Sequence, residues 1–544
     1  MDAGTFFANF EAIANAPGGV AQLRALILDL AMQGKLVEQD PEEKPASVPS
    51  PTSSSSNQPR KRSRKRKQLK DVTPDEQPFE PPEGWLWVRL GKAARLRRGF
   101  DLPVRKRVPG HVPVYGSNGP LGTHNEVGIR GPGVVTGRSG SIGKVHYVPG
   151  VFWPLNTALY VEDFFGNDPR FIELMLKYVN LQRFSSYSAV PTLNRNVAHE
   201  EPVLVPPFAE QIRIVARFDE LMALCDDLEA QQQHRNTLQT QFRASALDAL
   251  MQAEDGDDLD QAWARIREHW ADLTDHPDCV DEIRQVILQL AVRGKLVEQD
   301  PDDEPASVLL EHIAAEKARL VKEKKLRKPK KLPPFNQQDV PFSVPSGWSW
   351  CYLNDTGAIG TGTTPSTSNT EYYSNGSIPW VSSSLTGKDL IETGTSNITM
   401  LAVRECRLRI YPPGSLIVAL YGQGKTRGQV AWLGIHAAVN QACAAIEPVL
   451  DVEPLHRYLM LVLQRNYNKL RLKAAGGAQP NLNLGKLASM LVPLPPLAEQ
   501  YRIVARVNEL MALCDDLEQH LKQTHHLREA LAGAATHAVV QLGG

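Results

Sequence analysis

The chain has 544 residues, of which 42% are hydrophobic and 22% are charged, and its formal net charge is −1. It is too long for a single hydrophobic core, and no apolar run approaches the ~18 residues that a membrane-spanning helix needs. This composition is typical of a soluble globular protein with several domains, and the net charge alone does not indicate a nucleic-acid partner.

The N-terminal segment and the cysteines exclude further classes. No basic region followed by an apolar stretch begins the chain, so a secretion signal is not expected and a cytoplasmic location is. The six cysteines are scattered, with no C-x-x-C pair and no Cys/His cluster at zinc spacing. We therefore expect neither disulfide bonds nor a bound metal.

In chain order, the first informative feature is an internal repeat. Three pairs of segments match: 22–47 with 282–307, 84–87 with 347–350, and 206–229 with 495–518. The offset between the copies grows from 260 to 263 to 289 residues, so the second copy holds 26 more residues between its second and third segments. The inserts between these segments, 88–205 and 351–494, show little similarity to each other. A constant frame that carries two different inserts suits a protein with two different recognition heads.

The spacers between the repeats predict where the ends of the chain lie. The 21 residues before the first repeat and the 26 after the last sum to 47, close to the 52 residues between Glu229 and Glu282. Residues 263–290 also resemble residues 6–30 in the spacing of aromatic and apolar side chains. We expect the two termini to lie together and the molecule to close with pseudo-twofold symmetry.

Two basic runs precede the inserts. Residues 60–70 hold eight Lys or Arg in eleven positions, and residues 317–331 hold nine with one Glu. Such runs suit a DNA backbone, but a solvated or disordered linker explains each run equally well.

The third repeated segment predicts a long helix in each copy. The tandem prolines Pro206 and Pro207 mark a helix start, and the helical pattern continues to about Met251, which gives a rod of about 65 Å. Apolar residues at heptad spacing predict a coiled-coil seam between the two rods, although each stripe packing on its own domain is an alternative. The seam residues are Ile214, Phe218, Leu221, Cys225, Leu228, Ile503, Val507, Leu510, Cys514 and Leu517.

The inserts have the pattern of short strands joined by turns. β-branched runs occur at 133–136, 145–148 and 415–420, and helices are expected at about 170–181 and 454–473. Each insert is therefore predicted to be a strand-rich α+β domain.

Three segments of the sequence partly match catalytic motifs, and none of them is a convincing catalytic site. Gly424-Lys425-Thr426 lacks the earlier Gly of a phosphate-binding loop, because position 419 is Ala. The Pro-Pro-Phe segments at 206–208 and 333–335 lack the polar residue of an adenine methyltransferase tetrad. Asp302, Glu323 and Lys325 match a loose nuclease pattern but lie in a Lys-rich, helix-like stretch, where chance is the better explanation.

The repeated Gly-Lys-Leu-Val-x-Gln-Asp-Pro segments and the Pro-Pro-x-Ala-Glu-Gln starts of both long helices resemble the specificity subunit of type I restriction-modification systems. This resemblance implies an α+β fold with two target recognition domains, separated by two long antiparallel coiled-coil helices, in a pseudo-twofold tandem repeat. It implies a non-catalytic chain in which each domain reads one half of a split double-stranded DNA site. Implied partners are two methyltransferase (modification) subunits and restriction subunits; S-adenosylmethionine, ATP and Mg are then expected on those partners, with none on this chain.

Loop side chains of the inserts that can bond base edges or phosphates are the DNA-binding candidates. For any single one, surface turn chemistry is a better explanation than base contact. They are Tyr115, Ser117, Asn118, Arg138, Ser139, Ser141, Lys144, Asn194 and Arg195 in the first insert, and Ser382, Ser383, Tyr421, Gln423, Lys425, Arg427, Asn481 and Asn483 in the second.

Two other functions remain as alternatives: a coiled-coil adaptor whose inserts bind proteins, and a self-sufficient restriction enzyme with a nuclease at Asp302, Glu323 and Lys325. The predicted domain organisation has eight parts. They are frame 1–47, basic Ser/Pro-rich linker 48–87, recognition domain 88–205, long helix 206–253, second frame segment 254–307, basic linker 308–350, recognition domain 351–494 and long helix 495–544.

Overall fold

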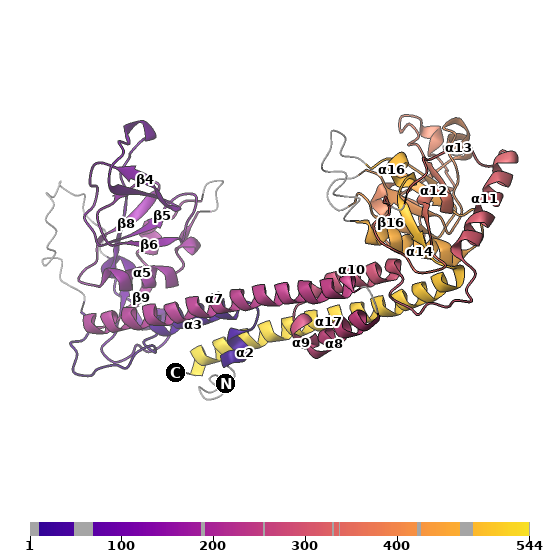
Figure 1. The fold of residues 1–544 in the computed structure, drawn as a ribbon. Coiled ribbons are helices and arrows are strands. Elements are labelled where there is room, and N and C mark those ends of the chain that lie inside the picture. Colours follow the sequence, from indigo (N-terminus) through magenta and orange to yellow (C-terminus); the bar gives the residue numbers. More distant parts are fainter. Residues whose placement is uncertain are drawn as a thin grey trace. The chain divides into compact units, whose positions relative to one another are not determined.

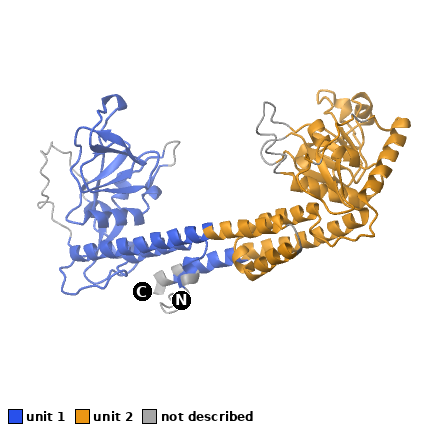
Figure 2. Cartoon of the chain, viewed as in Figure 1, with its two compact units in different colours: residues 1–237, 524–544 blue, residues 238–523 orange. Residues whose placement is uncertain are grey.

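Figure 1 shows the chain in a computed structural model, which describes residues 10–47, 69–186, 191–253, 256–328, 331–336, 338–421, 426–467 and 482–542. The chain divides into two compact units, coloured separately in Figure 2. Unit 1 comprises residues 1–237 and 524–544, and unit 2 comprises residues 238–523. Each unit contains one β domain, and the division falls within the two long helices α7 (Phe208–Gln252) and α17 (Leu497–Leu542).

The β domain of unit 1 contains a four-stranded sheet of order β2-β8-β5-β6, a three-stranded sheet of order β4-β3-β7, and the antiparallel pair β1 and β9. The strands are β1 (Leu86–Arg89), β2 (Arg95–Arg98), β3 (Val112–Gly116), β4 (Gly119–His124), β5 (Gly133–Gly137), β6 (Val145–Val148), β7 (Trp153–Pro154), β8 (Ala158–Asp163) and β9 (Pro202–Val205). The helices before α7 are α2 (Phe10–Ala14), α3 (Gly19–Met32), α4 (Leu90–Ala93), α5 (Pro169–Tyr178) and α6 (Arg195–Ala198), with single turns η1 (Pro74–Glu76), η2 (Val104–Lys106) and η3 (Leu181–Phe184).

Unit 2 repeats this topology. Its sheets have the orders β11-β18-β15-β16-β13 and β14-β12-β17, and β10 pairs with β19. The strands are β10 (Ser349–Tyr352), β11 (Ala358–Thr361), β12 (Ile378–Val381), β13 (Leu390–Ile391), β14 (Ser396–Ile398), β15 (Leu416–Ala419), β16 (Val430–Leu433), β17 (Ala438–Val439), β18 (Cys443–Glu447) and β19 (Leu491–Leu494). The helices before α17 are α8 (Gly256–Glu268), α9 (Trp270–Leu273), α10 (Cys279–Arg293), α11 (Ala306–Lys322), α12 (Leu353–Thr356), α13 (Met400–Glu405), α14 (Glu453–Arg465) and α16 (Leu484–Ala488), with turns η4 (Thr370–Tyr372) and η5 (Ser383–Leu385).

The greater length of the second insert has a place in this topology. In the first domain β3 ends at Gly116 and β5 begins at Gly133, whereas in the second β12 ends at Val381 and β15 begins at Leu416. The longer connection contains β13, which extends the larger sheet by one strand, and α13. Two inserts with little sequence similarity thus share one strand order, as expected for two α+β recognition domains.

Helix α5 connects the first domain to the helical frame. It begins at Pro169 because the Asp168 side chain accepts a hydrogen bond from the Phe171 amide at 2.9 Å and caps the helix. Its apolar side chains, among them Phe171 and Leu174, are buried in one cluster with Val134 of β5. α5 contacts β5 and β6 on one side and α3 on the other, so the frame supports the sheet through this helix (Figure 1).

The two ends of the chain lie together in unit 1, as the spacer lengths predict. Ile13 of α2 and Leu23 of α3 share a buried cluster with Ala532 and Ala535 of α17. In unit 2, α8, α9 and α10 take the corresponding place, where Leu250 of α7 is buried in one cluster with apolar residues of these three helices.

The repeat extends to single ion pairs of the frame. Arg24 contacts Asp226 at 2.5 Å and Glu229 at 2.8 Å in unit 1. Arg284, its equivalent at offset 260, contacts Asp515 at 2.6 Å and Glu518 at 2.7 Å in unit 2. The pseudo-twofold repeat inferred from the sequence therefore holds at the level of side-chain contacts within each unit.

The residues predicted to form the seam pack against several elements. Ile214 and Phe218 pack into the core of the first β domain, while Cys225 and Leu228 pack with α2, α3 and the end of α17. On α17, Ile503, Val507, Leu510, Cys514 and Leu517 belong to a cluster with α10 and the second β domain. These residues therefore contact α3, α10 and the β domains, and Cys225 also shares a buried cluster with Ala532 and Ala535 of α17. The heptad seam between the two long helices stays a prediction.

Smaller differences concern helix limits. The helix expected at 170–181 ends at Tyr178 and is followed by η3, and the one expected at 454–473 spans Glu453–Arg465, with 468–481 outside the described residues. The basic linker predicted over 308–350 begins with helix α11, in which Leu309 and Ile313 are buried. No helix in the described ranges is long and apolar enough to cross a bilayer.

Candidate functional site

In the first domain, the loops that follow β3 and β5 converge. A Cβ added to Gly137 would lie 1.8 Å from the carbonyl oxygen of Ser141 and 2.6 Å from that of Ser117, so only glycine fits where these loops meet. The amides of Arg138 and Ser139 both donate to the carbonyl of Thr157, and the Leu193 amide donates to the carbonyl of Arg138 at 2.8 Å. Four segments distant in sequence are thereby brought to one edge of the domain.

Some of the predicted residues line a hollow of about 410 Å³ at this edge. Arg138, Asn194 and Arg195 line it together with Arg98 of β2. Leu159 lies among them, and the remaining lining residues are Ser186, Thr192 and Leu193. Three guanidinium groups around one concave surface can bond the acceptor atoms of a nucleic acid.

The other first-domain candidates do not line the hollow and differ in their exposure. Tyr115 is half-buried, with its ring 6.2 Å from that of Phe152 and 6.1 Å from that of His146, so it acts in packing. Asn118, Ser141 and Lys144 are exposed, while Ser117 and Ser139 are half-buried.

Two asparagine candidates cap short helices. The Asn194 Oδ1 accepts from the Asn196 amide at 3.2 Å at the start of α6. The Asn483 Oδ1 accepts from the Lys486 amide at 2.8 Å at the start of α16. Both side chains thus carry out the turn chemistry that was the alternative to DNA contact.

In the second domain the other described candidates follow β12 and β15 in the chain or precede β16. Ser382 follows β12, and its Oγ lies 2.8 Å from the Oγ of Ser384 and 3.0 Å from the Oγ1 of Thr395. Ser383 is half-buried, Tyr421 is 39% exposed, and Arg427 is half-buried on the way to β16. Gln423, Lys425 and Asn481 lie outside the described residues, as does most of the Gly-Lys-Thr segment.

Sequence reasoning missed Arg98. Residues 95–98 read Arg-Leu-Arg-Arg, and in a strand alternate side chains point to opposite faces. Arg97 pairs with Glu162 on β8, whereas Arg98 lines the hollow. The feature of the sequence that could have indicated Arg98 is a short basic strand next to turn-forming residues.

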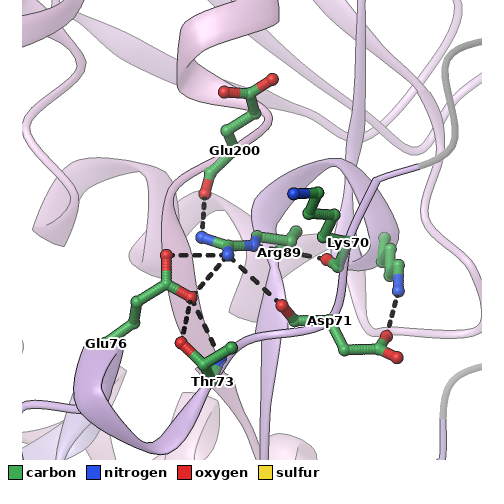
Figure 3. Close-up of polar contacts among 7 residues, drawn as sticks. Lys70, Asp71, Thr73, Glu76, Arg89 and Glu200 are labelled. Atoms are coloured by element: carbon green, nitrogen blue, oxygen red, sulfur yellow. Dashed lines mark hydrogen bonds and ion pairs between the residues drawn. The ribbon is translucent and has the colours of Figure 1, made fainter.

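Figure 3 shows how the segment that follows the first basic run is fixed to its domain. Arg89, at the end of β1, donates to both carboxylate oxygens of Glu76 at 2.8 and 2.6 Å and to the carbonyl of Glu200 at 2.7 Å. It also bonds the carbonyls of Lys70 and Asp71. The hydrogen bonds that Glu76 accepts from Arg89, and after them those from Thr73, hold the pKa of its carboxyl low, at about 2. The structure thus ties the end of the basic run to the first domain; residues 48–68 lie outside the description.

The nuclease pattern has no support among the described residues. Asp302 lies in a turn, where its amide donates to the Asp300 carboxylate at 3.0 Å. Glu323 pairs with Arg319 at 2.6 Å and Lys325 at 2.9 Å. Within the described ranges, no three His, Cys, Asp or Glu side chains are grouped so as to hold a metal ion.

Comparison with known proteins gives concordant matches. The specificity subunit of the type I restriction enzyme EcoAI from Escherichia coli is 28% identical over 96% of this chain and 94% of its own length. The EcoEI specificity subunit from Escherichia coli is 29% identical over 95% and 94%. The solved HsdS subunit from Thermoanaerobacter tengcongensis aligns with 86% of this chain and 99% of its own, at 17% identity and a TM-score of 0.41. The family model described as "Type I restriction modification DNA specificity domain" matches residues 82–237 and 345–524, one range for each repeat. The chain therefore belongs to the type I restriction-modification DNA specificity family.

Proposed function

We propose that the chain is the DNA-recognition subunit of a type I restriction-modification complex and that each β domain reads one half of a bipartite site. The observation that supports this best is one strand order occurring twice with different loop side chains. Ser117 follows β3 where Ser383 follows β12, but Arg138 follows β5 where Leu420 follows β15. Two heads of the same topology with different polar surfaces suit the recognition of two different base sequences.

The chain is proposed to act without catalysing a reaction. Adenine methylation with S-adenosylmethionine and cleavage driven by ATP and Mg are assigned to partner subunits, and no cofactor is assigned to this chain. The role of the chain is to place those activities at one DNA sequence.

The partners are proposed to include two copies of a methyltransferase subunit, together with restriction subunits. The frame displays hydrophobic side chains in repeat-equivalent pairs: Ile212 and Tyr501 are 45% and 60% exposed, and Leu224 and Leu513 are 53% and 57% exposed. Exposed apolar side chains on a helix mark a surface that another protein can cover. Two equivalent surfaces suit the same partner bound twice.

The test is co-expression of the chain with the methyltransferase subunit encoded beside it, followed by mapping of methylated adenines in the DNA. We expect methylation at one bipartite sequence that depends on the chain. Methylation without sequence preference, or none with any neighbouring methyltransferase, contradicts the proposal. Footprinting distinguishes the adaptor alternative, because an adaptor protects no DNA at any salt concentration, whereas a reader protects two patches.

The number of methyltransferase subunits has its own test. Ile212→Glu and Tyr501→Glu should each reduce the complex measured by native mass spectrometry to one methyltransferase subunit, and the double variant should bind none. Gln231→Glu, which changes an exposed side chain of α7, is the matched control and should leave two. Two subunits retained by the double variant would place the docking surfaces elsewhere.

A further inference from the structure

We infer that the hollow lined by Arg98, Arg138 and Arg195 makes the first domain the reader of a guanine in its half-site, a requirement that the second domain does not share. The inference rests on the proposed function and names what one of the two heads recognises. It is carried by the fixed position of two of the arginines, by the free position of the third, and by the difference between the domains.

Two of the arginines are held by one pair of neighbours. The Arg98 Nη2 donates to the Asp101 Oδ1 at 3.3 Å, and the same carboxylate oxygen accepts from the side-chain amide of Asn156. The backbone carbonyl of Asn156 in turn accepts from the Arg138 Nη1 at 3.3 Å. Asp101 and Asn156 thus link the two guanidinium groups. Because the two arginine side chains are already held in place, they lose less conformational entropy on binding than two freely rotating side chains would.

The third arginine has its donors available. The Arg195 side chain is exposed, and its guanidinium forms no hydrogen bond or ion pair with the residues that the structure describes, while its backbone begins α6 on the rim of the hollow. A guanidinium presents its donors in a planar fork, which matches the O6 and N7 acceptors of guanine. Arg195 is therefore the group from which we expect the direct base contact.

The strand registers show what stands at the same places in the second domain. Arg98 pairs with Leu159 in the first domain, and Thr361 pairs with Ala444, the equivalent of Leu159, in the second domain. Arg98 therefore corresponds to Thr361. By the same registers Arg138 corresponds to Leu420, and the helix caps make Arg195 correspond to Leu484. All three arginines are thus replaced by uncharged residues at these described positions.

This difference favours a base contact over a phosphate contact. Phosphates occur at the same spacing along both half-sites, so contacts that only position the DNA are needed equally by both heads. Base sequence is what differs between two half-sites, and Arg with guanine is the commonest specific pairing. An arginine cluster whose three positions hold uncharged residues in the described part of the other head therefore fits sequence reading.

The experiment uses the complex of the full chain with its methyltransferase subunits. The sequence methylated by the wild-type complex is determined first, and every base of both half-sites is then varied in a methylation competition. Arg195→Ala removes an exposed side chain without described partners, so folding should be unaffected. Arg98→Lys keeps the charge but removes the fork, and Arg97→Ala, whose guanidinium pairs with Glu162, is the control.

We expect Arg195→Ala and Arg98→Lys to lower the preference for one G·C pair in one half-site on the order of 10-fold, with the other half-site and the control unchanged. A uniform loss of binding at all sequences, with a weaker dependence on salt and with Arg98→Lys tolerated, would identify a phosphate contact and overturn the inference. Unchanged preferences in both variants would overturn it as well. If the wild-type complex methylates no defined sequence, it is the proposed function that fails.

Discussion

The indole nitrogen of Trp85 donates a hydrogen bond of 3.0 Å to a carboxylate oxygen of Glu210, which joins the segment entering the first β domain to the first turn of α7. The second copy repeats the bond between Trp348 and Glu499 at 2.7 Å. Both carboxylates are buried, with 1% exposure. Each recognition domain is thus fixed to a long helix by the same buried contact.

This contact predicts a pH dependence of stability. Burial raises the pKa of Glu210 to about 7 from 4.5, against the opposing effects of Trp85 and Arg213. The folded chain therefore holds a proton that the unfolded chain releases, and the stability of unit 1 should fall as pH rises from about 4.5 to about 7, by roughly 3 kcal/mol at most.

Glu210→Gln keeps an oxygen for the Trp85 bond but does not titrate, so the loss between pH 5 and pH 8 should be smaller than in the wild type. Urea midpoints at the two pH values measure it. Glu220→Gln, at an exposed position of the same helix, should retain the wild-type dependence. Equal pH dependence in all three chains would show that Glu210 does not titrate in this range.

A second prediction concerns the glycine of the repeated Gly-Lys-Leu-Val segment. Gly34 has φ +72°, and an added Cβ would lie 2.7 Å from the Pro82 side chain and 3.0 Å from that of Trp85. Gly34→Ala should cost about 1–3 kcal/mol of unfolding free energy, measured by urea denaturation, because backbone strain and crowding add. Gly150→Ala, where a Cβ meets nothing within 4 Å, should change it by less than about 0.5 kcal/mol; similar losses in the two variants would remove the explanation for this glycine.

The cap at α16 gives a third prediction. Serine can accept the Lys486 amide as Asn483 does, but it lacks the side-chain amide that reads adenine. Asn483→Ser should therefore leave base preference in the second half-site unchanged, while Asn483→Ala should lower stability by about 1 kcal/mol. Competition methylation with substituted sites measures the preference. A relaxed requirement for one A·T pair in the serine variant would show that Asn483 contacts DNA after all.

The repeat made much of the fold predictable from the sequence. Two copies of Gly34 to Pro41 and two Pro-Pro-x-Ala-Glu-Gln segments indicate duplicated helices, and β-branched runs mark β5, β6 and β15 at nearly their observed positions. The partners of the heptad stripe were not predictable, because periodicity shows that a face is apolar and not which element covers it. Arg98 was missed for a related reason: its role depends on loops 40 and 97 residues further along the chain, which meet only in the folded domain.

The length of the two long helices, α7 and α17, should set the distance between the two half-sites. Seven residues inserted into both α7 and α17, near residues 237 and 523, add about 10 Å of helix, which is about 3 base pairs. The sequence methylated by the lengthened complex should keep both half-sites and gain about that spacing. An unchanged spacing, in a chain that still directs methylation, would show that the helices do not act as a ruler.

Each domain is proposed to read its own half of the DNA site, and the exchange of one domain is the decisive experiment. Residues 88–205, which lie between repeated frame segments, are replaced by the corresponding domain of another family member, and methylated adenines are mapped for the chimeric complex. We expect a new sequence in one half-site, with the other half-site and the spacing as in the wild type. A chimera that changes both half-sites, or that folds and still methylates the original sequence, would contradict it.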